Sequence, residues 1–282
     1  MKQVMIYGKI LLENLSIIKL IINMKLFLKI SGVLLICILS IGCKTSGNKA
    51  LVAISPKVYS KQTDSLPLIP KYFLELETNS AGYCLVRGKL NRKVVALTFD
   101  DGPTNLSNKI LDVLNKNRVK ATFFWQGNNL DDNIQIIEKA KKSGHQIANH
   151  SWDHANGYNF DENIVWEQQV LRTNSALKTV AGVQSKYYRP PFGGITQKQI
   201  DFLGTKGITT VLWSLTTMDW DKSQNEGIDL VNKFKNHLHP GAIVLMHDYD
   251  FGKSEEMLVA LDNMILYGKS QGYVFVTIEN IK

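Results

Sequence analysis

The stretch that decides the fold is Val94-Val95-Ala96-Leu97-Thr98-Phe99-Asp100-Asp101-Gly102-Pro103. Its first six residues are almost entirely apolar, as expected of a strand that is buried on both faces. The apolar run stops at two adjacent aspartates, and Gly102-Pro103 then marks a turn. Two neighbouring carboxylates repel each other unless a cation or a proton separates them. The pair is therefore either a functional site or an acidic surface turn, and residues elsewhere in the chain decide between the two.

Downstream of this strand, apolar strand-like runs alternate with segments of helical spacing. The strand-like segments are 121–125, 146–148, 187–188, 209–213, 242–246 and 273–278, and the helical segments are 108–117, 134–143, 161–181, 196–206 and 254–271. Strands that alternate with helices indicate a parallel sheet or barrel. Such folds carry their chemistry at the carboxyl ends of the strands. The sequence therefore predicts an α/β fold with a site at that edge.

Four further groups of chemically versatile residues follow these strands. They are His150-Ser151-Trp152-Asp153-His154, Arg189-Pro190-Pro191-Phe192-Gly193-Gly194, Asp219-Trp220 and Leu245-Met246-His247-Asp248. Two histidines four residues apart can bind one metal ion, and a carboxylate such as Asp101 would complete a site of two imidazoles and one carboxylate. Such a site leaves coordination positions for water and substrate. Taken singly, each group also fits an ordinary polar loop or turn.

In order and in residue type, the five groups resemble the motifs of the polysaccharide deacetylase family, over about residues 92–279. The resemblance implies a distorted (β/α) barrel and a divalent metal, usually zinc, with cobalt or other divalent ions as alternatives. It also implies a hydrolase that removes N-acetyl groups from a polysaccharide such as peptidoglycan or a chitooligosaccharide. The alternatives are an esterase that acts on O-acetyl groups, as in acetylxylan, and an inactive lipoprotein that binds polysaccharide.

The resemblance also assigns roles to individual residues. These roles are general base for Asp100; metal ligands for Asp101, His150 and His154; orientation of the base for Arg189; an oxyanion-binding backbone N–H for Phe192; walls of the acetyl pocket for Trp220 and Leu245; and general acid for His247. A positioned base and a positioned acid can each add roughly 10²–10⁴-fold to the rate. Cleavage of an amide needs a protonated leaving nitrogen, so an acid separate from the base is required.

One position departs from the family pattern. The fourth motif usually has an aspartate three residues before Asp219, whereas this chain has Thr216 there. In relatives that first aspartate is thought to tune the catalytic histidine. The departure therefore predicts a lowered pKa for His247, and it leaves open whether Asp219 can take over the tuning role.

The N-terminal part of the chain has the pattern of an export leader. Residues 1–43 contain a second possible start at Met24, a basic stretch, an apolar run over 30–41 and finally Cys43. This order resembles the lipobox of bacterial lipoproteins, with Ser40 as a departure, and it implies lipidation of Cys43. The apolar run is shorter than the ~20 residues of a spanning helix. We therefore expect a lipoprotein of the cell envelope, with an uncleaved anchor or ordinary secretion as the alternatives.

The rest of the chain is expected to divide into two parts. Residues 44–90 are expected to form a tether and a short N-terminal extension, and residues 91–282 the catalytic domain. The formal net charge is +8, and five lysines against one glutamate before residue 43 account for half of it. No basic run is interleaved with aromatic residues, so nucleic acid is not an expected partner. The expected partners are an acetylated polysaccharide and, through the lipid, the membrane, and the protein is expected to be a monomer.

Overall fold

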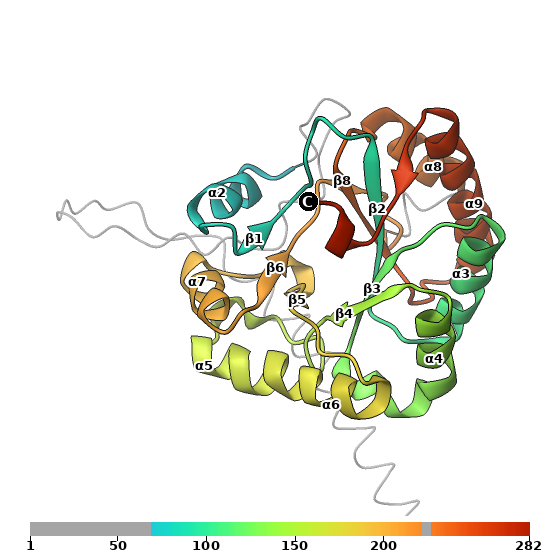
Figure 1. Ribbon diagram of the computed structural model, residues 1–282. Helices are drawn as coiled ribbons and strands as arrows, with labels where there is room; N and C mark the ends of the chain where they lie inside the picture. Colours follow the sequence, from blue (N-terminus) through green and yellow to red (C-terminus); the bar gives the residue numbers. More distant parts are fainter. Residues whose placement is uncertain (1–68, 222–226) are drawn as a thin grey trace, which may run out of the picture. The chain divides into compact units, whose positions relative to one another are not determined.

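The computed structural model describes residues 69–221 and 227–282, which form a parallel sheet surrounded by helices (Figure 1). The strands are β1 (Cys84–Leu85), β2 (Val94–Asp100), β3 (Thr122–Trp125), β4 (Gln146–Asn149), β5 (Tyr187–Tyr188), β6 (Thr209–Val211), β7 (Leu215–Thr216), β8 (Ala242–His247) and β9 (Val274–Phe275). The helices are α2 (Lys71–Asn79), α3 (Asn105–Lys116), α4 (Ile134–Lys142), α5 (Glu162–Ile164), a π-helical stretch (Val165–Leu171), α6 (Arg172–Ala181), α7 (Gln197–Thr205), α8 (Gly227–His237) and α9 (Ser254–Ser270).

The strands pair in the order β1-β6-β5-β4-β3-β2-β8-β7, and β9 pairs with the beginning of β2. Every pair is parallel. Figure 1 shows the sheet curled, with the helices arranged around its outside. This arrangement is a distorted (β/α) barrel, so the fold class predicted from the sequence is confirmed. Because all strands run the same way, their carboxyl ends gather at one edge, where the sequence places its functional residues.

Strand β2 forms the centre of the fold, and all seven of its residues are buried. Its side chains alternate between two apolar clusters, as the pleat of a strand requires. Val95, Leu97 and Phe99 pack with residues of the surrounding helices α3, α4 and α9. Val94 and Ala96 belong to the second cluster, which lies on the other face of the sheet and includes residues of α2 and α7. Asp100 follows the alternation of Ala96 and therefore projects toward this second side.

The fold begins earlier than the boundary at residue 91 that the sequence analysis suggests. Helix α2 and strand β1 precede this boundary, and Cys84 and Leu85 of β1 pair with β6. Phe73 of α2 packs edge-on against Trp213, with the ring centroids 5.0 Å apart. Strand β7 and helix α8 are likewise absent from the elements expected from the sequence. The domain therefore includes a helix and a strand from the segment that was assigned to the tether and extension.

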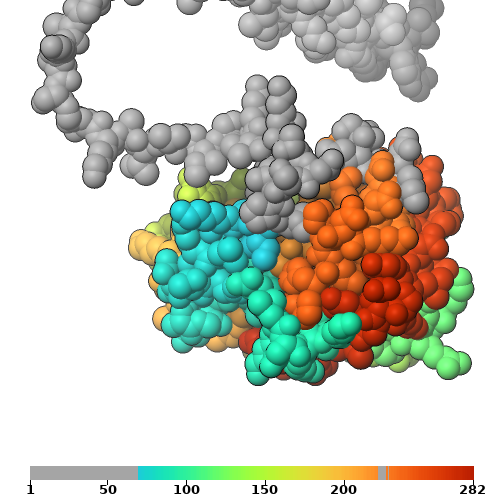
Figure 2. Space-filling model, turned by 90° about the horizontal axis from the view of Figure 1, so that it is seen from above, coloured from blue at the N-terminus to red at the C-terminus, as the bar shows by residue number. Residues whose placement is uncertain are grey.

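The loop before β2 connects this early segment to the C-terminal half of the chain. The N–H of Gly88 donates to the carbonyl of Gly241 at 2.8 Å, and in Figure 2 the two regions lie side by side on one face. A side chain at Gly88 would meet the carbonyl oxygen of Ile281 at 2.4 Å, so this close approach requires glycine.

The leader lies outside the described residues, and so does the chain up to residue 68. The start at Met24, the lipidation of Cys43 and the tether therefore stay predictions. Within the described part of the chain, no helix is both long enough and apolar enough to cross a membrane.

Candidate metal centre and active site

Asp100 and His247 occupy paired positions on two neighbouring strands. Asp100 ends β2, His247 ends β8, and the two residues are register partners in the sheet. Side chains at paired positions project to the same face of the sheet. Both therefore lie at the carboxyl ends of their strands, on the face that the second core cluster covers. Asp100 is 2% exposed. The sheet itself therefore brings together the two residues that the sequence analysis assigned as base and acid.

Arg189 holds one oxygen of Asp100. Its Nη1 donates to Asp100 Oδ1 at 2.7 Å and to the hydroxyl of Thr98, also at 2.7 Å. Its Nε and Nη2 donate to the carbonyls of Val211 and Leu212 at 3.2 and 3.1 Å. The guanidinium is fully buried and therefore has to be paired in this way. Arg189 lies where the sequence analysis expects it, in contact with the candidate base.

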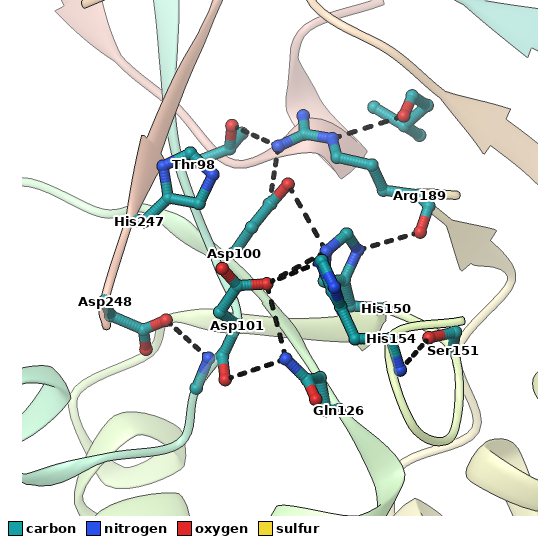
Figure 3. Close-up of polar contacts among 12 residues, drawn as sticks. Thr98, Asp100, Asp101, Gln126, His150, Ser151, His154, Arg189, His247 and Asp248 are labelled. Atoms are coloured by element: carbon teal, nitrogen blue, oxygen red, sulfur yellow. Dashed lines mark hydrogen bonds and ion pairs between the residues drawn. The ribbon is translucent and has the colours of Figure 1, made fainter. Parts of the chain in front are cut away.

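Asp101, His150 and His154 form the candidate metal centre (Figure 3). One carboxylate oxygen of Asp101 lies 3.0 Å from His154 Nε2 and 3.3 Å from His150 Nε2. The possible ligand atoms of the three residues all lie within 4.8 Å of one another. Asp101 has a φ of 82°, in the left-handed region that residues other than glycine rarely adopt. Neighbouring side chains in an extended chain point to opposite sides, yet Asp100 and Asp101 both face the histidines. The left-handed conformation of Asp101 turns its carboxylate to that side.

The loop that carries the two histidines is fixed by its own side chains. The amide oxygen of Asn149 accepts from the N–H of Ser151 at 2.9 Å, and the hydroxyl of Ser151 accepts from the N–H of His154 at 3.0 Å. Ser151 and His154 both have positive φ values, 70° and 60°. The loop therefore folds back on itself directly after β4, and both imidazoles reach the same carboxylate.

A hydrogen bond at the other ring nitrogen of His150, the one that does not face Asp101, also suits a divalent metal ion. His150 Nδ1 lies 2.8 Å from the carbonyl oxygen of Arg189. A carbonyl can only accept, so Nδ1 keeps its proton, and Nε2 is the ring nitrogen that would bind a metal ion once it has lost its own proton. Metal-binding histidines in proteins are held in this way. Two imidazoles and one carboxylate suit Zn²⁺ and leave positions for other ligands.

The charges of the centre are strongly coupled. Burial opposes ionisation of Asp101, but hydrogen bonds from His150 and His154 outweigh it and lower the pKa of the carboxyl below its usual range. Burial also opposes protonation of His150, but Asp100 and Asp101 together raise its pKa. A cation that binds here must displace the proton from such a histidine, so metal affinity is expected to fall at acidic pH.

His247 is paired with Asp219. Asp219 Oδ2 accepts from the backbone N–H of His247 at 2.7 Å, and its Oδ1 lies 3.0 Å from His247 Nδ1. Burial alone would lower the pKa of His247, but the carboxylate of Asp219, with smaller contributions from Asp101 and Asp100, raises it to about 9. A carboxylate thus raises the pKa of His247 even though Thr216 stands where relatives have an aspartate. Asp219 supplies the carboxylate, and the hydroxyl of Thr216 accepts from the N–H of Met218 at 3.2 Å.

Aromatic rings line both sides of the centre. Trp220 and Phe251 each meet the ring of His247 edge-on, with centroids 5.1 and 5.5 Å away. Phe192 is 64% exposed and packs edge-on against His154 at 4.7 Å. Leu245 is 4% exposed and belongs to the second core cluster. Trp220 and Phe192 thus lie at the centre as expected, and Leu245 lies two residues before His247 on the same face of β8.

Three residues at the site were given no role from the sequence, although Asp248 stands in one of its motifs. Gln126 Nε2 lies 3.3 Å from Asp101 Oδ1, and Asp248 accepts a hydrogen bond from the N–H of Gly102 at 2.7 Å. The third is Phe251, next to His247. Gln126 and Asp248 each follow the last residue of a strand, so the rule that points to strand ends could have found them. Nothing in the sequence signals Phe251.

Comparison with known proteins gives matches over the described domain. The sequence model of the polysaccharide deacetylase family matches residues 87–211. A peptidoglycan-N-acetylglucosamine deacetylase from Bacillus cereus is 34% identical over 195 residues, which cover 69% of this chain and 70% of the relative.

Two solved structures extend the comparison to three dimensions. A peptidoglycan N-acetylglucosamine deacetylase in complex with 4-naphthalen-1-yl-N-oxidanyl-benzamide matches with a TM-score of 0.69 and 31% identity, over 76% of this chain and 96% of that one. A CE4-family pseudoenzyme from Bacillus anthracis matches with a TM-score of 0.65 and 28% identity, over 71% of this chain and 69% of that one. Similar chains therefore include both a named deacetylase and a protein named as inactive.

Proposed function

The chain belongs to the polysaccharide deacetylase family, and from this we propose that it is a metal-dependent hydrolase that removes N-acetyl groups from peptidoglycan. Its relatives named as deacetylases are consistent with a hydrolase of carbon–nitrogen bonds; the substrate, the metal dependence and the residue roles are the proposal. The observation that carries it is the placement of Asp100 and His247 on paired strand positions beside the Asp101–His150–His154 centre.

The first half of the proposed reaction needs a base. A divalent cation held by the three ligands would polarise the acetyl carbonyl and make water more acidic. Arg189 occupies Asp100 Oδ1, while Asp100 Oδ2 lies 3.8 Å from His150 Nε2, on the side of the centre. Asp100 Oδ2 is therefore the atom that would take the proton from the attacking water. Arg189 would keep this carboxylate oriented while the proton moves.

The second half needs an acid. Asp219 holds His247 Nδ1, so Nε2 is the ring nitrogen that would deliver a proton to the leaving amine. Asp219 raises the pKa of His247 to about 9, and this favours the protonated ring at neutral pH. An amine leaves only when it is protonated, and this makes the site suited to amides. The backbone N–H of Phe192, on the turn next to His154, is the proposed donor to the oxyanion.

One assay tests the proposed deacetylase against two alternatives, an inactive protein and an O-acetyl esterase. A protein without activity is disfavoured because base, ligands, arginine and acid are all present in the described residues, with the base held by Arg189 and the acid by Asp219. An O-acetyl esterase would use the same groups. The test measures acetate release from peptidoglycan, chitooligosaccharides and acetylxylan with Zn²⁺ added. We expect peptidoglycan to give the highest rate. Preference for acetylxylan would favour the esterase, and no release from any substrate would favour the inactive protein.

The proposed substrate also sets a location. Peptidoglycan lies outside the cytoplasm, and the leader with Cys43 is the feature of the sequence that would take the domain there. We therefore propose a protein of the cell envelope that is held to the membrane by a lipid on Cys43 and acts on the adjacent wall.

Removal of the metal is expected to abolish acetate release, and Zn²⁺ or Co²⁺ is expected to restore it. His150→Ala takes one of three ligands from a centre with a single carboxylate, so metal affinity should fall together with activity. The measurements are metal content per chain after dialysis and acetate release before and after re-addition. A His150→Ala protein that still binds one ion per chain as tightly as the wild type would refute the ligand assignment.

The pH profile is expected to depend on Asp219. Activity requires protonated His247, so it should be lost as the pH rises through the pKa of about 9. Asp219→Asn removes the negative charge that raises this pKa, and the basic limb of kcat/KM should move to lower pH by roughly 1–3 units. Thr216→Asp is the matched control, and we expect it to move the limb less. If Thr216→Asp shifts the limb and Asp219→Asn does not, the pairing is assigned to the wrong residue.

A further inference from the structure

Asp248 is a buried carboxylate that the proposed reaction does not use. It follows His247 at the end of β8, and because side chains alternate along a strand it points away from the catalytic face. It is fully buried, and none of the ion pairs formed by residues 69–221 and 227–282 includes it. A buried carboxylate is costly unless hydrogen bonds satisfy its oxygens. Its partners therefore indicate what it is for.

Three donors converge on this carboxylate from three different elements. Oδ1 accepts from the backbone N–H of Gly102 at 2.7 Å. Oδ2 accepts from the hydroxyl of Ser107 at 2.6 Å and from Trp125 Nε1 at 2.7 Å. Gly102 lies in the turn after β2, Ser107 in the first turn of α3, and Trp125 at the end of β3. Asp248 thus connects the ends of β2, β3 and β8 with the start of α3.

The contact with Gly102 is so close that it admits no side chain. A Cβ at this position would lie 2.2 Å from Asp248 Oδ2 and 2.6 Å from its Cγ. The N–H of Gly102 belongs to the peptide unit that directly follows Asp101 (Figure 3). Anchoring this peptide fixes the backbone on one side of Asp101, which adopts the left-handed φ of 82°. An unanchored turn would be able to relax out of this rarely adopted conformation.

We propose that Asp248 is a positioning residue of the metal centre: its carboxylate anchors Gly102 and so holds Asp101 toward His150 and His154. The inference rests on the metal-binding role proposed above, and it adds a residue that touches neither the ion nor the substrate. Such outer partners orient the ligands, and their loss typically costs about 10–100-fold in metal affinity or activity.

Asp248→Asn is the sharpest test, because the substitution keeps the shape of the side chain. In either orientation the new NH₂ group faces a donor that cannot accept, either the Gly102 N–H or Trp125 Nε1. We expect Zn²⁺ affinity, measured by competition with a coloured chelator, to fall by about 10–100-fold. We also expect the visible absorption bands of the Co²⁺-loaded protein to shift. Both readouts use the full chain without substrate.

A matched control separates positioning from plain stabilisation. Asn117 is also a buried polar residue, and its Nδ2 donates to Val113 O at 2.9 Å and Asp262 Oδ1 at 2.6 Å. It lies at the end of α3, away from the centre. Asn117→Ala should lower the melting temperature without changing Zn²⁺ affinity. In the Asp248→Asn background, Trp125→Phe removes one opposing donor and should recover part of the lost affinity.

The inference is overturned if Asp248→Asn lowers the melting temperature, as Asn117→Ala does, but binds Zn²⁺ as tightly as the wild type. If Asp248→Asn does not fold, Ser107→Ala is the deciding variant, because it removes one of the three hydrogen-bond donors to Asp248. A fall in Zn²⁺ affinity smaller than that expected for Asp248→Asn supports the proposal. An unchanged Zn²⁺ affinity overturns it. A wild-type chain that binds no Zn²⁺ would instead refute the metal-dependent function, and this inference with it.

Discussion

His247→Ala is expected to lower kcat/KM for an N-acetylated glycan by roughly 10²–10⁴-fold while the rate on an activated aryl acetate changes little. The reason is the leaving group. An amine has to be protonated to depart, and His247 is the residue that Asp219 keeps charged. An aryl oxide departs without a proton, so the ester reaction needs only the base and the metal centre.

The measurement compares both substrates with wild type and variant at the same metal occupancy. His247→Gln is the useful second variant, since it keeps a polar side chain without an acidic proton. Equal losses on the amide and on the ester would remove His247 from the proton transfer and assign it a structural or binding role.

Asp100→Asn is expected to retain the metal and to lose activity by roughly 10²–10⁴-fold on both substrates, since both need an activated water. Asn is isosteric and can still accept from Arg189, so the site should keep its geometry. Its amide cannot take a proton from water at neutral pH. Because this loss extends to the ester, Asp100→Asn and His247→Ala should give different substrate patterns.

Metal content and the pH profile complete the experiment. We expect one ion per chain in the wild type and in Asp100→Asn. Loss of the ion in Asp100→Asn, with retention in Asp101→Asn, would show that the two adjacent aspartates have exchanged roles.

The sequence predicted the central features because they depend on local pattern. The short apolar run at 94–99 indicated an interior strand, and the motifs fell where parallel strands end. Helix α2 was missed because the prolines at 67 and 70 made its segment ambiguous, with only a short apolar stretch at Tyr72-Phe73-Leu74. Its two buried side chains, Phe73 and Leu76, are buried by residues far away in the sequence, such as Trp213, which packs against Phe73. Such long-range contacts do not show in the local pattern.

The partner of His247 could not be predicted from spacing. Thr216 ends the two-residue strand β7 and Asp219 follows three residues later, so by spacing either could have faced the histidine. The backbone decides between them: Met218 has a φ of 60°, and the chain reverses there so that Asp219 returns to His247. A single left-handed residue leaves little trace in sequence, and the same is true of Asp101.

The buried guanidinium of Arg189 has a consequence for how the protein unfolds. It bonds to Asp100 and Thr98 of β2 and to carbonyls at the end of β6, while its own backbone N–H donates to Asn149 of β4. The side chain that orients the base thus joins β2 to the end of β6, and the backbone of the same residue adds β4. None of these strands can separate without leaving buried polar groups unpaired. With Zn²⁺ kept saturating, denaturant should therefore abolish activity and melt the sheet in one cooperative step.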